Sequence, residues 1–100
     1  MPKLAFTVPT QLTADQAATH LRGFIPQIRE HYKDQVKDVT ETWTGNTLDF
    51  SFKTLGFVFK GTLAAADNKV DVSMDLPLAA MMVKGRIEQE VRTGLERLLK

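Results

Sequence analysis

Residues 43–76 read WTGNTLDFSFKTLGFVFKGTLAAADNKVDVSMDL, and apolar residues alternate with polar ones through most of this stretch. A period of two residues is typical of a strand with one buried and one solvated face. The alternating segments are separated by Gly45-Asn46, Thr54–Gly56 and Asp67-Asn68, which contain residue types that favour tight turns. Together with residues 39–43, the pattern predicts four consecutive antiparallel strands joined by short links.

A strand and a helix precede these four strands. Residues 4–8 alternate in the same way, and Pro9 ends this first strand. Thr13 and Gln16 have the spacing of a capping box, so we expect a helix to begin there and its apolar stripe to continue to Tyr32. Pro26 lies on the side of this helix opposite the apolar stripe, so we expect a kinked helix rather than a full break.

The last helix is predicted over residues 77–98, with Pro77 in its first turn, where a missing N–H costs nothing. Gly94 lies on its apolar stripe and is expected to let the helix approach the sheet closely, whereas Gly85 lies on its outer face. The order β-α-β-β-β-β-α predicts one α+β domain over residues 1–100. The simplest arrangement is a curved antiparallel sheet with both helices on its apolar face, which resembles TATA-binding-protein-like and helix-grip folds.

The composition argues against several classes of protein. The chain has 43% apolar residues, 25% charged residues, a net charge of +1 and no cysteine, so disulfides and thiolate metal sites are excluded. Its 13 Lys and Arg residues are interleaved with 12 Asp and Glu residues, which leaves no basic stripe for a nucleic acid. No segment approaches the roughly 18 apolar residues of a membrane span, and we expect a cytoplasmic location.

No constellation of residues predicts catalysis or metal binding. The chain lacks a nucleophile elbow and a glycine-rich phosphate loop. His20 and His31 lie eleven residues apart, too far to share a metal, and are expected at the surface. Glu41 is the one ionisable group among the inward strand positions, and a buried carboxylate there would suit a general acid or base. A sheet edge with the carboxylate in water is the simpler interpretation, so we expect no enzyme, no metal and no cofactor.

Five aromatic residues lie on the inward face of the central strands. They form the largest apolar group in the sequence: Trp43, Phe50, Phe52, Phe57 and Phe59. One interpretation is an aromatic-lined pocket for an apolar ligand. The other is a filled core, which we expect because two helices would leave little packing around a large cavity.

The last helix begins with an unbroken apolar run, Leu78 to Val83. A helix that faces one sheet buries only a stripe, and Ala80 and Val83 belong to that stripe. Leu78, Met81 and Met82 point sideways or away from it at 100° per residue. Flexible methionines suit an adaptable contact surface, so these three residues form the predicted interaction surface.

The sequence also carries a family resemblance. The stretches WTGNTLDFSF (residues 43–52) and GFVFKGTLAAADNKVDVSMDLPLAAMMVKGRIEQEVRTGLERLL (residues 56–99) resemble the family of small polyhydroxyalkanoic acid system proteins. Members of this bacterial family are encoded beside the genes of polyester storage granules. The resemblance extends from LTADQAA (residues 12–18) to the C-terminus and includes no catalytic signature. It implies a granule context, but no established reaction and no functional residues that could be carried over.

Two functions follow as expectations. The first is a non-catalytic accessory protein, peripheral on polyhydroxyalkanoate granules, that contacts the polyester surface or another granule protein through Leu78, Met81 and Met82. The alternative is a small binding protein for acyl or lipid-like ligands, with a pocket that involves Trp43 and the phenylalanines of residues 50–59. A homodimer formed through the methionine patch is compatible with both, and the sequence leaves the partner and the oligomeric state open.

Overall fold

Nine elements make up the computed structural model, which describes residues 3–100. Met1 and Pro2, part of the predicted domain, lie outside the described residues. In chain order the elements are β1 (Lys3–Pro9), α1 (Ala14–Leu21), α2 (Phe24–His31), β2 (Lys37–Thr44), β3 (Thr47–Thr54), β4 (Phe57–Ala66), β5 (Lys69–Asp75), the 3-10 helix η1 (Leu78–Val83) and α3 (Lys84–Leu98).

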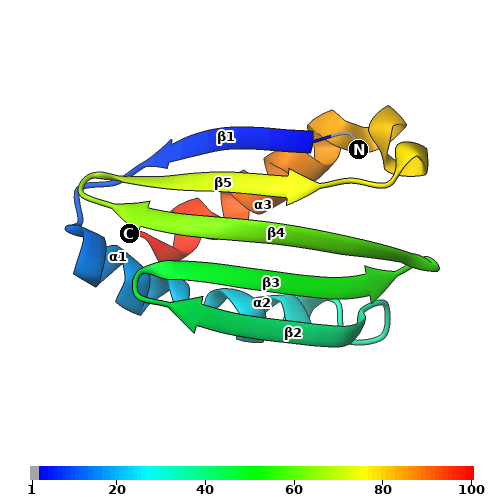
Figure 1. Cartoon of the computed structure of the whole chain (residues 1–100), viewed down its shortest axis with the longest axis horizontal. Helices are drawn as coiled ribbons and strands as arrows, with labels where there is room; N and C mark the ends of the chain where they lie inside the picture. Colours follow the sequence, from blue (N-terminus) through cyan, green and yellow to red (C-terminus); the bar gives the residue numbers. More distant parts are fainter. Residues whose placement is uncertain (1–2) are drawn as a thin grey trace.

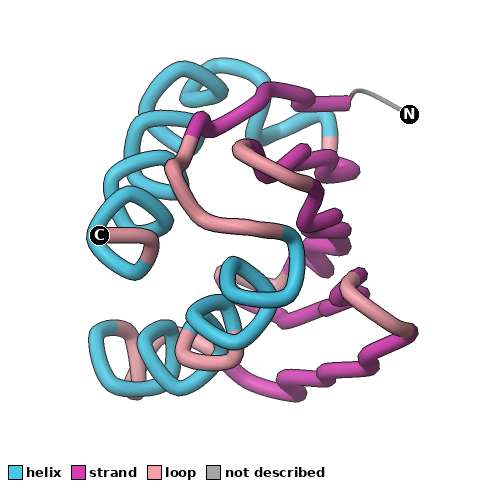
Figure 2. The backbone as a smooth tube through the Cα atoms, turned by 90° about the vertical axis from the view of Figure 1, so that its left-hand side faces the viewer, coloured by secondary structure: helices cyan, strands magenta, loops and turns pink. Residues whose placement is uncertain are grey.

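The five strands form one antiparallel sheet in the order β1-β5-β4-β3-β2 (Figure 1). Strands β2 to β5 follow one another as a meander, and β1 joins the far edge by pairing with β5 from Lys3↔Asp75 to Pro9↔Lys69. The helices all lie on one face of the sheet (Figure 2). The predicted α+β class and element order are therefore confirmed.

The first helical segment is broken where the sequence predicted a kink. The Thr13–Gln16 capping box is present, and α1 begins at the residue after Thr13. α1 ends at Leu21 and α2 begins at Phe24, after Gly23. Pro26 is the third residue of α2, where a helix has no N–H bond to lose. The chain therefore avoids the strain of an internal proline by starting a new helix, and the expected continuous helix is wrong.

The last helical segment is also divided. Leu78–Val83 is a 3-10 helix rather than the first turns of an α-helix, and Pro77 stands just before it as its N-cap. Gly94 faces α2 and not the sheet: a Cβ there would lie 2.6 Å from Gln27 Nε2. The expected close approach at Gly94 therefore exists, but between two helices.

Gly61 makes room for the most central aromatic ring of the sheet. It pairs with Phe50 across β3 and β4, and the Phe50 ring lies over it. A Cβ at residue 61 would lie 2.5 Å from Phe50 Cζ and 3.0 Å from Met74 Cγ. Since Phe50 and Met74 are both buried, neither side chain can move aside without disturbing the core.

Gly61→Ala should therefore destabilise the protein by about 1–3 kcal/mol, the usual cost of overpacking a filled core. Gly85→Ala is the matched control, because nothing lies within 4 Å of a Cβ at that position in α3. There the change should stabilise the protein by up to about 1 kcal/mol through helix propensity. Free energies of unfolding from urea titration test both variants, and a Gly61→Ala protein as stable as the parent contradicts the packing argument.

Candidate functional site

A large apolar cleft lies between α2, α3 and the sheet. Its volume is about 680 Å³, which falls within the range of about 300–1,000 Å³ that is typical of small-molecule pockets. Apolar side chains supply most of its wall, and they come from all three of these elements and from η1. The apolar lining residues include Phe24, Ile28, Val36, Phe50, Phe52, Leu55, Phe57, Phe59, Met74, Ala80, Val83, Ile87 and Val91.

Phenylalanine rings form the floor of the cleft. Phe50 and Phe52 are stacked with centroids 6.3 Å apart, and Phe52 and Phe59 are stacked at 5.4 Å. Phe24 of α2 meets Phe50 edge-on at 5.3 Å, which joins the floor to the helix above it. These distances lie in the favourable range for aromatic pairs, so the rings hold one another in place around the open space.

Of the rings expected in a filled core, Phe50 and Phe59 are buried, whereas Phe52 is half-buried and Phe57 is exposed at the cleft. Four of the five predicted aromatic residues line the cleft, but Trp43 is not among the residues that line it. The Trp43 ring lies under the guanidinium of Arg22, 4.6 Å from its centroid, and its Nε1 donates to Glu41 Oε2. Glu41 is exposed, which agrees with a carboxylate in water at the sheet edge.

Two contacts connect the helices across the cleft. Gln27 of α2 packs against Gly94 of α3, and the Tyr32 hydroxyl donates a 3.0 Å hydrogen bond to Glu90 Oε2. Elsewhere α3 packs on β1 at the edge of the sheet, whereas α1 packs on β4. Ile87 and Val91 of α3 are only half-buried, because they line the cleft.

An apolar rim surrounds one end of this cleft. Within residues 3–100, the exposed large apolar side chains number eight, and they come from three segments: the end of α2, the β3–β4 turn and η1. All three segments lie at the same end of the molecule, on the right in Figure 1. We define the apolar rim as Tyr32, Leu55, Phe57, Val58, Leu78, Met81, Met82 and Val83. Four of these, Tyr32, Leu55, Phe57 and Val83, also line the cleft.

The predicted surface residues belong to this rim. Leu78 is 78% exposed, Met81 39% and Met82 96%. Val83, predicted to be in the core, is 47% exposed, because η1 ends beside the open cleft. Leu55 and Val58 also belong to the rim, and neither was predicted, although a leucine in a Leu-Gly turn was the available signal.

Leu55 occupies a costly position at the tip of the β3–β4 turn. Its φ is +55°, a left-handed conformation that favours glycine, asparagine or aspartate, and its side chain is 88% exposed. A leucine here gains nothing from burial and loses about 1 kcal/mol to backbone strain. Such a local cost at an exposed position is typical of a functional surface.

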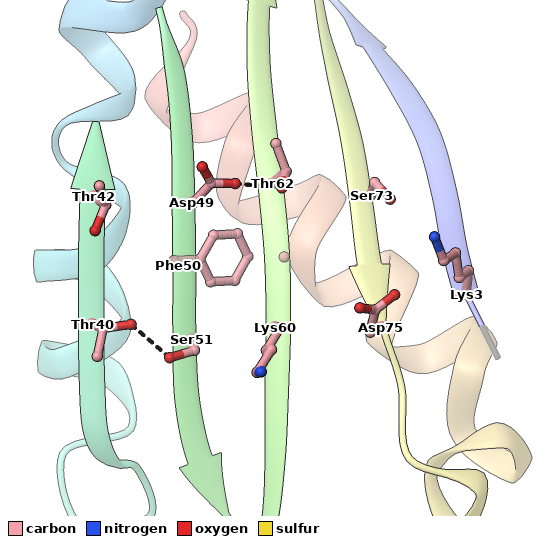
Figure 3. A pocket seen from close by; sticks show the side chains of 11 residues that line it. Lys3, Thr40, Thr42, Asp49, Phe50, Ser51, Lys60, Thr62, Ser73 and Asp75 are labelled. Carbon is pink, nitrogen blue, oxygen red and sulfur yellow. Dashed lines mark hydrogen bonds between the residues drawn. The ribbon is translucent and has the colours of Figure 1, made fainter. Parts of the chain in front are cut away.

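The opposite face of the sheet bears a polar hollow of about 390 Å³ (Figure 3). Its side chains bond to one another: Thr40 Oγ1 lies 2.6 Å from Ser51 Oγ, and Thr62 donates to Asp49 Oδ1 at 2.8 Å. Phe50 lines both the hollow and the cleft, because its ring lies over Gly61, which has no side chain to separate the two. The hollow is a solvated face in which Thr40, Asp49, Ser51 and Thr62 are paired with one another.

His20 has a structural role, and Nδ1 donates a 2.7 Å hydrogen bond to the Leu98 carbonyl at the end of α3. His31 lines the cleft. In residues 3–100 no cluster of three metal-ligating side chains occurs. Across the same described residues, no helix combines the length and apolar character needed to cross a membrane.

Comparisons with known proteins agree with this description. A profile of the family described as "Putative polyhydroxyalkanoic acid system protein" matches residues 4–99, which confirms the family resemblance. No curated protein matches the chain. Among solved structures, it is similar to the one described as "Crystal structure of Ara h 8.0201", with a TM-score of 0.51 and 12% identity over 98% of this chain and 97% of that one. At this identity the similarity concerns the fold alone.

The Tyr32 phenol should titrate above its usual pKa of about 10, because burial raises the pKa and the hydrogen bond to Glu90 raises it further. The chain has one tyrosine, so an ultraviolet titration reports this group directly. Glu90→Gln should lower the pKa but leave it above the usual value, since burial is the larger cause.

The same shift sets the sign of the pH dependence. Because the pKa of Tyr32 is higher in the folded state, its stabilising contribution is complete below the unfolded pKa and is lost as pH rises through the folded pKa. A pKa that Glu90→Gln leaves unchanged would show that the bond across the cleft is absent in solution.

Proposed function

This chain belongs to the polyhydroxyalkanoic acid system family, and from that membership we propose that it is a non-catalytic accessory protein of polyhydroxyalkanoate granules. The apolar rim contacts the polyester surface of the granule. The observation that carries this proposal is the gathering of all eight exposed large apolar side chains of residues 3–100 at one end of the molecule.

The shape and chemistry of the rim suit a soft apolar surface. The rim consists of protruding tips, the β3–β4 turn and η1, rather than one flat face (Figure 1). Met81 and Met82 have unbranched side chains that can adapt to an irregular surface, and Leu55 projects its side chain fully. Insertion of these side chains removes apolar area from water, at roughly 25 cal/mol for each Å².

Lysines flank each part of the rim. Lys33 follows Tyr32, Lys53 precedes the β3–β4 turn, and Lys84 follows Val83. Long lysine side chains can lay their carbon stems along an apolar surface and keep their ammonium groups in water. The protein can thus sit at an interface between the polyester and water without burying a charge.

The double variant Met81→Glu/Met82→Glu should abolish co-sedimentation with purified polyhydroxyalkanoate granules, because two carboxylates cannot enter an apolar phase. Circular dichroism should be unchanged, since Met82 is 96% exposed and Met81 is exposed as well. Leu55→Glu should weaken co-sedimentation through a separate segment of the same rim.

The matched control is Gln11→Glu/Thr44→Glu, which adds the same charge at exposed positions at the opposite end of the molecule. This control should co-sediment like the parent protein. If the rim variants co-sediment with granules as well as the parent protein does, the proposed contact surface is rejected. If the rim variants instead turn a dimer into a monomer, as measured by light scattering, the rim is a homodimer interface and the granule contact is rejected.

The cleft favours a second candidate function, the binding of an apolar ligand. An aromatic-floored cleft of about 680 Å³ that opens within an apolar rim has the features of a pocket for an acyl or lipid-like chain. Both functions can belong to one protein, because the rim would then place the mouth of the cleft against the apolar phase.

An uncharged apolar dye such as Nile red should bind the protein and fluoresce more strongly. Ile87→Trp should weaken this binding by about tenfold, equal to about 1.4 kcal/mol, because the half-buried Ile87 lines the cleft and a larger ring fills it. Thr44→Trp places the same ring outside the cleft and should bind like the parent. Dye affinity that is equal in all three proteins rules out ligand binding in the cleft.

A further inference from the structure

The wall of the cleft carries positive charge that the protein does not neutralise. α3 contributes Arg86, Glu90 and Arg97 to the lining. The ion pairs found in the described residues include neither of these arginines. The cleft thus combines an apolar interior with two guanidinium groups that lack an acidic partner.

Glu90 is the nearest candidate partner for Arg86, one helical turn away, but it is engaged elsewhere. Its Oε2 accepts the hydrogen bond of the Tyr32 hydroxyl at 3.0 Å. The order Arg–Glu at i and i+4 is also the less favourable orientation for a helical ion pair. Arg86 therefore keeps its five N–H donors available at the mouth of the cleft.

We propose that the cleft binds an amphiphilic carboxylate, an alkanoate whose head group pairs with Arg86 while its tail lies along Phe52 and Phe59. This inference rests on the ligand-binding role proposed for the cleft. Each part of the ligand meets a suitable wall of the cleft. The guanidinium can donate two hydrogen bonds to a carboxylate, and the stacked rings can pack against methylene groups.

The position of Arg86 decides between the two arginines. Arg86 and Arg97 are eleven residues apart in α3, which is about 16 Å of helix, so one carboxylate cannot contact both. Arg86 follows Val83 of the rim by one turn and is exposed. A head group at Arg86 stays hydrated at the mouth, while the tail extends inward over the rings and loses its contact with water.

Displacement of bound Nile red by decanoate and by 1-decanol separates the head group from the tail. Arg86→Gln should raise the decanoate concentration needed for half-displacement about fivefold, a modest factor because an exposed ion pair is partly screened. It should leave displacement by 1-decanol unchanged. Arg86→Lys should lose part of the decanoate affinity, because an ammonium keeps the charge but cannot make the two-point contact, and added salt should weaken decanoate binding only.

Arg29→Gln is the matched control, because it removes an exposed arginine of α2 that does not line the cleft. It should leave displacement by both ligands unaffected.

If decanoate and 1-decanol both displace the dye and Arg86→Gln changes the displacement by neither, the cleft remains an apolar pocket and the carboxylate site is rejected. If Arg97→Gln causes the loss instead, the head group lies at the other end and the assignment to Arg86 is overturned. If neither ligand displaces the dye, the proposed cleft function fails together with this inference.

Discussion

The structure depends on how three helices, two of them only eight residues long, cover one face of a five-stranded sheet. Ten-residue β4 spans about 33 Å, whereas the eight residues of α2 span only about 12 Å. The helices therefore meet the sheet where α1 packs on β4 and α3 packs on β1. Between them lies the cleft, which leaves Phe52 half-buried and Phe57 exposed, whereas Phe50 and Phe59 stay buried. The cleft results from this shortage of cover, and the β3–β4 turn extends past the end of α2 for the same reason.

The rings at the floor of the cleft pack against neighbours on the sheet and on α2. Gly61 leaves room for the Phe50 ring on the sheet, and Phe24 of α2 packs edge-on against the same ring. The cleft floor is thus part of the core on one side and part of a surface on the other. A cavity can persist in a small domain when the residues that line it are braced by packing that does not cross the empty space.

The rim and the cleft have a common physical character, because both keep apolar side chains where water can reach them. Natural domains seldom expose this much apolar surface in one place without a use for it. The two-residue β3–β4 turn imposes a left-handed conformation on residue 55, but it does not require a leucine there, and the exposed Leu55 side chain is a local cost. The fold itself does not specify a function, because the similarity to Ara h 8.0201, at 12% identity, concerns the architecture alone.

Much of the architecture could be predicted from the sequence. Alternation in residues 43–76 determined the strands and their inward faces, the Thr13–Gln16 spacing determined the start of α1, and the apolar run at Leu78–Val83 indicated a surface in excess of the core. These features are local, because periodicity, capping and turn chemistry act over a few residues.

Tertiary packing alone decided the remaining features. Three features arise where separate elements meet: the break at Gly23, the 3-10 form of η1 and the contact of Gly94 with Gln27. The periodicity of apolar residues does not predict them. Phe50 to Phe59 could be assigned to the inward face, but whether helices fill the space above them depends on helix lengths and angles. Likewise, Arg86 meets the same cleft as Phe52 because α3 crosses the sheet beside α2. The sequence by itself therefore determined the elements and their apolar faces. The three-dimensional packing decided that the helices leave a cleft between these faces, because helix lengths and angles determine how much of the sheet they cover.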